Sequence, residues 1–177
     1  PPRGNEGPKH IVCDSTGLKI YGEGEWKVRH HGYSKRRTWR KLHLSVDEAT
    51  HAIEAVVLTE AGVDDAEAGR QLLHDTDGPI TQVSGDGTYD KRKFYEACVH
   101  REVEHIAIPP QRNAKIWQHG NSSKPPLPRD QTLRRIRRVG RQRWKQDVGY
   151  HRRSLAETAM FRFKTIFGNT LRTRSFE

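Results

Sequence analysis

Apolar residues in the first part of the chain recur at the two-residue spacing of β-strands. Residues 39–46 alternate between apolar and polar side chains, and residues 53–59 are rich in β-branched side chains. The turn-forming run at 47–50 separates these segments, so together they predict a β-hairpin. Residues 10–20 have the composition of a further strand. We therefore expect the chain to begin with three strands that pair in the antiparallel sense.

Further along the chain, segments typical of helices alternate with short strand-like segments. Asp64 and Asp65 place negative charge at the start of a helix that we expect to reach His74, because acidic side chains favour a helix N-terminus. We expect Asp90 to be the N-cap of a later helix that ends near Arg101. The remaining segments predict a buried strand, a short strand and a long last helix, at residues 80–84, 104–108 and 150–167.

This order of elements matches an RNase H-like α/β domain, in which helices flank a mixed five-stranded sheet. We expect residues 10–177 to form that domain, and residues 1–9 to be a linker or the truncated end of a longer protein. Residues 109–149 are predicted to be an irregular, Arg-rich insertion before the last helix, with a helix at 132–138.

The last predicted helix has one polar and one apolar face. Four polar side chains follow at intervals of three, four and seven residues and so share one stripe: Tyr150, Arg153, Glu157 and Lys164. The opposite arc is expected to enter the core and comprises Leu155, Ala156, Ala159, Met160, Phe163, Ile166 and Phe167. The stripe is then left at the edge of the core, where a carboxylate is flanked by cations.

Two aspartates complete an acidic set. Asp14 ends an apolar run, and Asp86 follows the predicted strand at 80–84. In the predicted architecture these positions converge with Glu157 at one edge of the sheet. Singly, they would be a structural aspartate, a turn residue and a surface ion pair. Together, three carboxylates suit a catalytic site with two Mg²⁺ ions, for which Mn²⁺ would substitute.

The charge balance points to a polyanionic partner. The 177 residues contain 32 Lys and Arg against 22 Asp and Glu, a formal net charge of +10. The cations cluster at residues 27–41 and 134–143, as in proteins that bind nucleic acid. We expect contacts with double-stranded DNA from Tyr150, Arg153, Lys164, Lys35, Arg36, Arg37, Lys41, Arg134, Arg135, Arg137, Arg138 and Arg141.

Other functional classes find little support. No apolar run reaches the ~18 residues of a membrane span, and no signal peptide is visible. Cys13 and Cys98 are the only cysteines and form no Cys-x-x-Cys pair, which argues against a structural zinc site. Both are expected to be buried thiols in a reducing compartment. We therefore expect a cytoplasmic protein.

These motifs resemble those of the DDE transposases of bacterial insertion sequences, in particular insertion-sequence families four and five. The Tyr-x₂-Arg-x₃-Glu-x₆-Lys hallmark of that family matches the polar stripe without departure. The two aspartates lie in motifs similar to the family's, 12–16 and 86–90, and the stretches 32–37 and 41–44 are also similar. The resemblance implies metal-dependent cleavage at transposon ends and transfer of the 3′-hydroxyl into target DNA, carried out by a homodimer in the DNA complex. It also implies a bacterial protein associated with the nucleoid.

Two other functions stay open. A related nuclease would only hydrolyse DNA, although the Tyr–Arg–Glu–Lys pattern argues against it. A catalytically silent, domesticated transposase would act as a DNA-binding protein, although the intact acidic set argues against decay. The short insertion, in place of the large β-rich insertion of some relatives, favours the family-five type.

Overall fold

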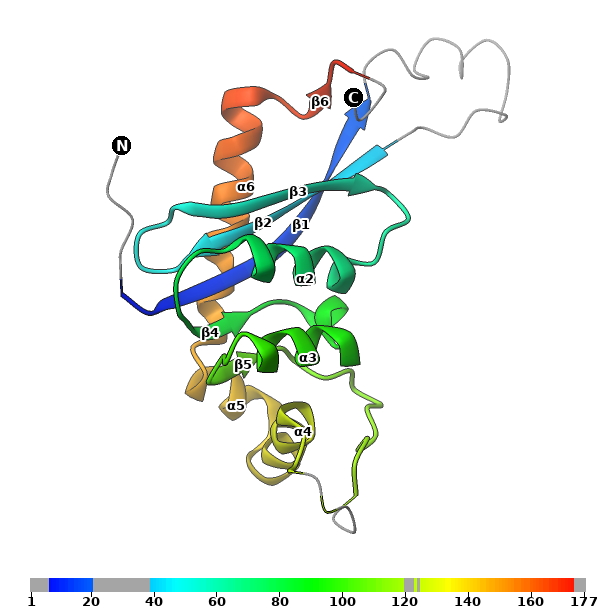
Figure 1. Ribbon diagram of the computed structural model, residues 1–177, viewed down its shortest axis with the longest axis vertical. Coiled ribbons are helices and arrows are strands. Elements are labelled where there is room, and N and C mark those ends of the chain that lie inside the picture. The colour runs from blue at the N-terminus through cyan, green and yellow to red at the C-terminus, as the bar shows by residue number, and fades with distance from the viewer. Residues whose placement is uncertain (1–6, 21–38, 120–122, 124, 174–177) are drawn as a thin grey trace.

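One mixed sheet organises the protein. The computed structural model describes residues 7–20, 39–119, 123 and 125–173. Within these residues six strands form a sheet of order β3–β2–β1–β4–β5, and β6 pairs with β1 beside this path (Figure 1). The strands are β1 (Lys9–Ile20), β2 (Trp39–Asp47), β3 (Ile53–Glu60), β4 (Ile80–Ser84), β5 (His105–Ala107) and β6 (Thr170–Leu171).

The pairing follows the predicted topology. β2 is antiparallel to both of its neighbours, β1 and β3, whereas β4 runs parallel to β1 and β5 runs parallel to β4. This mixed sheet with flanking helices confirms the prediction of an α/β domain of the RNase H-like type. The strand β6 was not predicted, and it adds a short parallel pairing at the C-terminal end of β1.

Helices cover both faces of the sheet. α2 (Asp65–Asp75) and α3 (Arg92–His100) lie on one face, and α6 (Ser154–Phe167) lies on the other (Figure 1). Side chains alternate along β1, so that Ile11 packs towards α2 and α3 while Val12 packs towards α6. The sheet therefore separates two hydrophobic cores.

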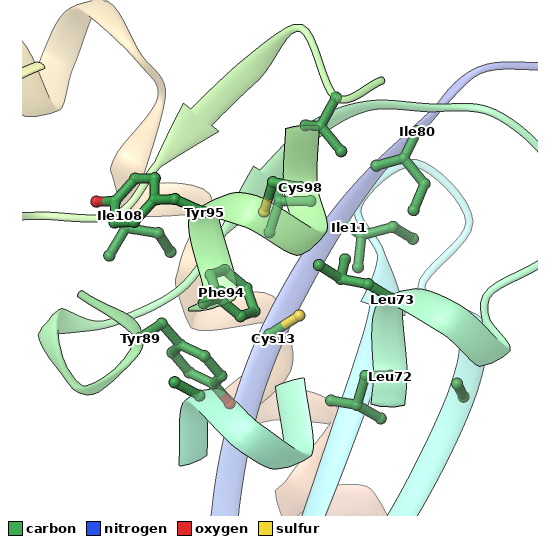
Figure 2. Close-up of a cluster of buried hydrophobic side chains, with 14 residues drawn as sticks. Ile11, Cys13, Leu72, Leu73, Ile80, Tyr89, Phe94, Tyr95, Cys98 and Ile108 are labelled. Carbon is green, nitrogen blue, oxygen red and sulfur yellow. The ribbon is translucent and has the colours of Figure 1, made fainter. Parts of the chain in front are cut away.

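The core under α2 and α3 is closely packed. Figure 2 shows Phe94 and Tyr89 beside Cys13 of β1, with Leu72 close by. A Cβ at Gly69 of α2 would lie only 2.7 Å from the ring of Phe94, so this close approach of the helices requires glycine. Both cysteines are buried as expected, and burial raises the pKa of the Cys13 thiol to about 12.

The core under α6 is smaller, and it corrects one expectation. Ala156, Ala159 and Met160 are buried against β1 and β2, as predicted for the apolar arc. Ile166 and Phe167, in contrast, are 72% and 71% exposed. Their burial was predicted from helical periodicity alone, but the contact between helix and sheet ends near Phe163, and the last turn extends past the core.

The insertion is more regular than expected. It contains α4 (Pro128–Val139), which is longer than the predicted helix at 132–138, and a second helix, α5 (Arg141–Asp147). Both lie beyond β5 (Figure 1). Gly140 joins them at φ 86°, in the left-handed region that favours glycine. Trp144 of α5 is buried and anchors this helix.

Local sequence patterns predict the start of α2 correctly and the cap of α3 wrongly. α2 begins at Asp64 and Asp65 as predicted, and Asp64 also caps it, because its side chain accepts the N–H of Ala66 at 2.9 Å. The prediction that Asp90 caps α3 is wrong: Lys91 occupies that position without a capping hydrogen bond. The carboxylate of Asp90 instead pairs with Arg129 of the insertion. The long last helix begins with a 3₁₀ turn, η2 (Tyr150–Arg153), before α6.

Candidate active site

Asp14 lies in the middle of β1, on the face covered by α6. Its side chain is 16% exposed, and Oδ1 accepts the backbone N–H of Ser15 at 2.9 Å. Burial raises the pKa of Asp14, and the negative charges of Asp86 and Glu157 raise it further, while Ser15 and Arg153 act in the opposite direction. Both of the other predicted carboxylates thus act electrostatically on Asp14.

Asp86 follows the last residue of β4 after one glycine. β1 and β4 are parallel with Val12 opposite Ser84, so Asp14 and Asp86 each lie two residues beyond a paired position. The two aspartates therefore lie side by side in the sheet direction, Asp14 within β1 and Asp86 just beyond the end of β4. The short 3₁₀ helix η1 (Gly87–Tyr89) begins here, and Asp86 Oδ1 accepts the N–H of Thr88 at 2.8 Å as well as its hydroxyl group. Thr88 thereby holds this carboxylate in place.

Glu157 reaches the same region from the first turn of α6. Its Oε1 lies 2.6 Å from Nη2 of Arg153, one helical turn earlier. Nη1 of the same guanidinium lies 3.5 Å from Oδ2 of Asp14. Arg153 therefore links a carboxylate on the sheet to a carboxylate on the helix, and the predicted polar stripe does face the edge of the core.

The ends of the stripe contact this region differently. Lys164 donates to the hydroxyl group of Thr16 at 2.6 Å, two residues after Asp14 on β1. Tyr150 packs its ring against Trp144. Burial raises the pKa of the Tyr150 hydroxyl, Arg153 opposes this, and the charges of the three carboxylates raise it further. Tyr150 thus shares the electrostatic environment of the acidic residues.

The donor set fits a hard divalent cation by its chemistry, since Mg²⁺ prefers carboxylate oxygens. The pKa of Asp14 is raised mainly by burial and further by the charges of Asp86 and Glu157, and a bound cation would offset both effects. Among the residues that the structure describes, no three His, Cys, Asp or Glu side chains are grouped closely enough to hold one ion. In this conformation Arg153 supplies the positive charge between Asp14 and Glu157.

A polar groove lies beside Asp86. It has a volume of ≈ 620 Å³, and its lining includes Asp86, Thr88, Lys41 and Lys91. Lys41, a predicted DNA contact, is held there by Asp65 at 3.0 Å and by the carbonyl of Val63 at 2.9 Å. The structure thus brings Lys41 to the same edge as Asp86. The predicted contacts Lys35, Arg36 and Arg37 lie outside the described residues.

Four of the five insertion arginines predicted to contact DNA bind other parts of the insertion. Arg135 pairs with Asp147 of α5 at 2.8 Å, whereas three others donate to backbone carbonyls. These are Arg134 to Gln118, Arg137 to Ala114 and Arg141 to Gln111. Arg138 is exposed. The insertion arginines lie apart from the carboxylates in sequence and fold, on α4 and α5.

Two threonines in the site were missed by sequence reasoning. Thr88 follows Asp86 at the spacing at which an aspartate side chain bonds to the backbone two residues on, which is a recognisable turn signal. Thr16 is two residues after Asp14, and because side chains alternate along a strand, its position on the same face of β1 could be predicted. Its bond to Lys164 had no local signal, because 148 positions separate the two residues.

Comparison with known families decides the classification. A family model described as a transposase DDE domain matches residues 5–177. The chain belongs to the DDE transposase family. The match includes β1, the turn after β4 and α6, which carry the three carboxylates, so it rests on the whole domain and not on one motif. No solved structure matches the chain.

Membership confirms the resemblance in its general form. DDE transposases act on DNA and depend in general on divalent metal, which is the class of chemistry expected of the acidic set. In the described part of this transposase domain, no helix has the length and apolar character needed to cross a membrane.

Proposed function

We propose that this domain is the catalytic domain of an insertion-sequence transposase of the family four/five type. It would cleave phosphodiester bonds at transposon ends and join the 3′-hydroxyl to target DNA. The observation that carries the proposal is the mutual arrangement of Asp14 and Glu157 about Arg153, with Asp86 raising the pKa of Asp14. These contacts support one charged site built from β1, the turn after β4 and α6.

In this proposal Asp14, Asp86 and Glu157 hold two Mg²⁺ ions, or Mn²⁺ in their place. When bound, such ions activate a nucleophilic oxygen and stabilise a leaving oxygen. The contribution of the chain is to fix the three carboxylates. The backbone N–H of Ser15 orients Asp14, and Thr88 orients Asp86. Arg153 restrains Glu157 from one turn away on the same face of the helix.

The cations around this site would position DNA. Lys164 and Arg153 lie on the side of α6 that faces Asp14, so a phosphate held there would be near the carboxylates. Lys41 lines the groove beside Asp86, and the arginines of α4 and α5 would contact DNA separately, away from this groove. We further propose that a homodimer forms in the DNA complex.

The decisive experiment separates cleavage from joining. Labelled DNA with the ends of the element that encodes the chain, intact or pre-cut, is incubated with Mg²⁺ or Mn²⁺. Asp14→Ala, Asp86→Ala and Glu157→Ala should each abolish both reactions and leave the protein folded. Glu96→Ala is the matched control, since Glu96 is an exposed carboxylate on α3, across the sheet from α6.

The outcomes distinguish the alternatives. Wild-type-like activity of one of the three variants would remove that residue from the site. Cleavage by the wild-type protein without joining of pre-cut ends would identify a nuclease that only hydrolyses. DNA binding without either reaction, at any divalent-metal concentration, would identify a catalytically silent DNA-binding protein.

A further inference from the structure

A buried ion pair lies next to the motif that contains Asp86. Asp90 is four residues after Asp86, and Arg129 is in the first turn of α4. Nε of Arg129 lies 2.6 Å from Oδ1 of Asp90, and Nη2 lies 3.3 Å from Oδ2. The side chain of Asp90 is only 2% exposed, and that of Arg129 is 4% exposed. This two-point contact between guanidinium and carboxylate is specific in geometry and shielded from water.

Further groups of the insertion surround the pair, among them Asp130, whose Oδ1 lies 3.5 Å from Nη1 of Arg129. The guanidinium of Arg129 lies 3.7 Å from the ring centroid of Trp117, and its Nη1 donates to the carbonyl of Lys115 at 2.8 Å. Oδ2 of Asp90 also accepts the backbone N–H of Gln111 at 3.2 Å. Burying two charges is costly unless their remaining hydrogen-bonding capacity is met. Here the insertion meets it, and Asp90 itself is bound to two parts of that segment, Arg129 and the backbone of Gln111.

The adjacent Asp130 completes the unit. It is fully buried, and its carboxylate accepts the backbone N–H groups of Trp117 at 3.0 Å and Gln118 at 2.8 Å. The extended segment 111–118 is therefore tied to the start of α4 by side-chain bonds. The segment, the start of α4 and Asp90 form one connected polar cluster.

The other side of the Asp86 motif is anchored in the apolar core. Tyr89 is buried between α2 and α3, with its ring 5.1 Å from that of Phe94. A Cβ at Gly85 would lie 2.8 Å from the Tyr89 ring, so the chain passes close to the ring just before Asp86. The turn that carries Asp86 is thus held by Tyr89 in the core and by Asp90 in the polar cluster.

We propose that Asp90 and Arg129 are positioning residues that fix the carboxylate of Asp86 and couple the insertion to the candidate active site. The pair does not touch the site itself, but acts through the turn 86–90. Displacement of α4 is transmitted through Arg129 and Asp90 to this turn. The role of the Asp90–Arg129 pair in metal binding rests on the proposed function of Asp86. Its role in holding the turn 86–90 in place does not.

The test measures local order and metal binding in the whole protein. Asp90→Asn keeps the shape of the side chain and removes its charge, and Arg129→Lys keeps the charge and removes the planar fork. The backbone N–H of Thr88 donates a hydrogen bond to Asp86. In both variants we expect the hydrogen of this N–H to exchange with solvent about tenfold faster or more. The Mn²⁺ concentration at half-maximal thermal stabilisation should rise about 10-fold, as for residues that orient metal ligands.

Arg135→Lys is the matched control. Arg135 lies on the same helix and also forms an ion pair, with Asp147 at 2.8 Å, but this pair is exposed and distant in sequence from Asp86. It should leave both measurements unchanged. The amide of Leu44 in β2, which pairs with β1 opposite Asp14, reports on the stability of the whole sheet and should also stay unchanged in all three variants.

Each outcome decides the question. Normal Thr88 exchange in Asp90→Asn and Arg129→Lys would overturn the proposal. Equal acceleration at Thr88 and Leu44, or failure of both variants to fold, would assign the pair a general role in stability and also overturn it. If Asp86→Ala retained Mn²⁺ binding, the metal assignment would fail, but selectively faster exchange at Thr88 would still support positioning of the turn.

Discussion

Arg153 contacts Asp14 across the junction of α6 and β1, with Nη1 3.5 Å from Oδ2. The same guanidinium also binds Glu157 at 2.6 Å. A fixed positive charge thus lies between two of the carboxylates proposed to hold metal. It lowers the pKa of Asp14 against the larger, opposite effect of burial. Arg153 therefore has two proposed roles, to restrain the carboxylates and to contact DNA, and the two can be separated.

Arg153→Gln should bind divalent metal at least as tightly as the wild-type protein. Two like charges about 4 Å apart near a protein surface repel by about 4 kcal/mol, and movement of the arginine relieves most of this. We expect half-maximal thermal stabilisation at a Mn²⁺ concentration lower by up to about tenfold, together with slower cleavage. Thermal-shift titration beside cleavage assays measures both. Weaker Mn²⁺ binding would show that the arginine is required to assemble the carboxylates.

Asp14→Asn should raise the melting temperature at neutral pH without metal. Burial raises the pKa of Asp14 in the folded protein, so between the unfolded and folded pKa values the folded state binds more protons. The unfolding free energy therefore falls as pH rises through that interval, and the asparagine variant escapes this loss. The difference in melting temperature between Asp14→Asn and the wild-type protein should vanish at pH values below the ordinary aspartate pKa of 3.8.

Thermal denaturation of both proteins from acid to neutral pH measures this effect. Glu96→Gln on α3 controls for the loss of one carboxylate charge. A melting temperature of Asp14→Asn that is lower than wild type at neutral pH would mean that the bond to Ser15 and the pair with Arg153 outweigh the cost of burial.

Lys164→Met and Thr16→Val should each lower the unfolding free energy by about 1 kcal/mol, because each breaks the 2.6 Å bond between α6 and β1. The double variant should cost little more than either single change, since the two side chains share one interaction. Urea denaturation of the four proteins completes the cycle. Additive losses would show that the bond contributes nothing to stability.

The same variants test the role of Lys164 towards DNA. Thr16→Val leaves the ammonium group in place, whereas Lys164→Met removes it. We expect Lys164→Met to join pre-cut ends much more slowly than Thr16→Val. Equal joining rates would limit Lys164 to fastening α6 onto β1.

DNA binding should weaken steeply with salt, and exposed arginines of α4 should account for part of this dependence. Each lost phosphate contact should flatten the slope of log affinity against log salt by roughly one unit. Arg138→Ala should flatten it more than Arg135→Ala, because Arg138 is exposed while Asp147 already neutralises part of the charge of Arg135. Binding that is unchanged between low and moderate salt would contradict the expectation drawn from the net charge of +10.

The contrast between two aspartates shows how far local patterns reach. Asp64 was correctly predicted to lie at the start of a helix, and its capping bond joins residues two positions apart. Asp90 has the same type of local setting, yet its partner Arg129 is 39 positions away. A capping motif competes with any stronger partner that folding supplies, and here a buried guanidinium prevailed over the backbone N–H groups of α3.

The sequence by itself determined the order and type of most elements, the alternation along β1 and the stripe on α6, because these follow from the local periods of strands and helices. Tertiary structure decided which side chains meet. The last turn of α6 is exposed because the sheet contact ends, Lys164 binds Thr16 across 148 positions, and Arg129 reaches Asp90 from the insertion. Such contacts depend on how separate elements pack in three dimensions, which no local period encodes.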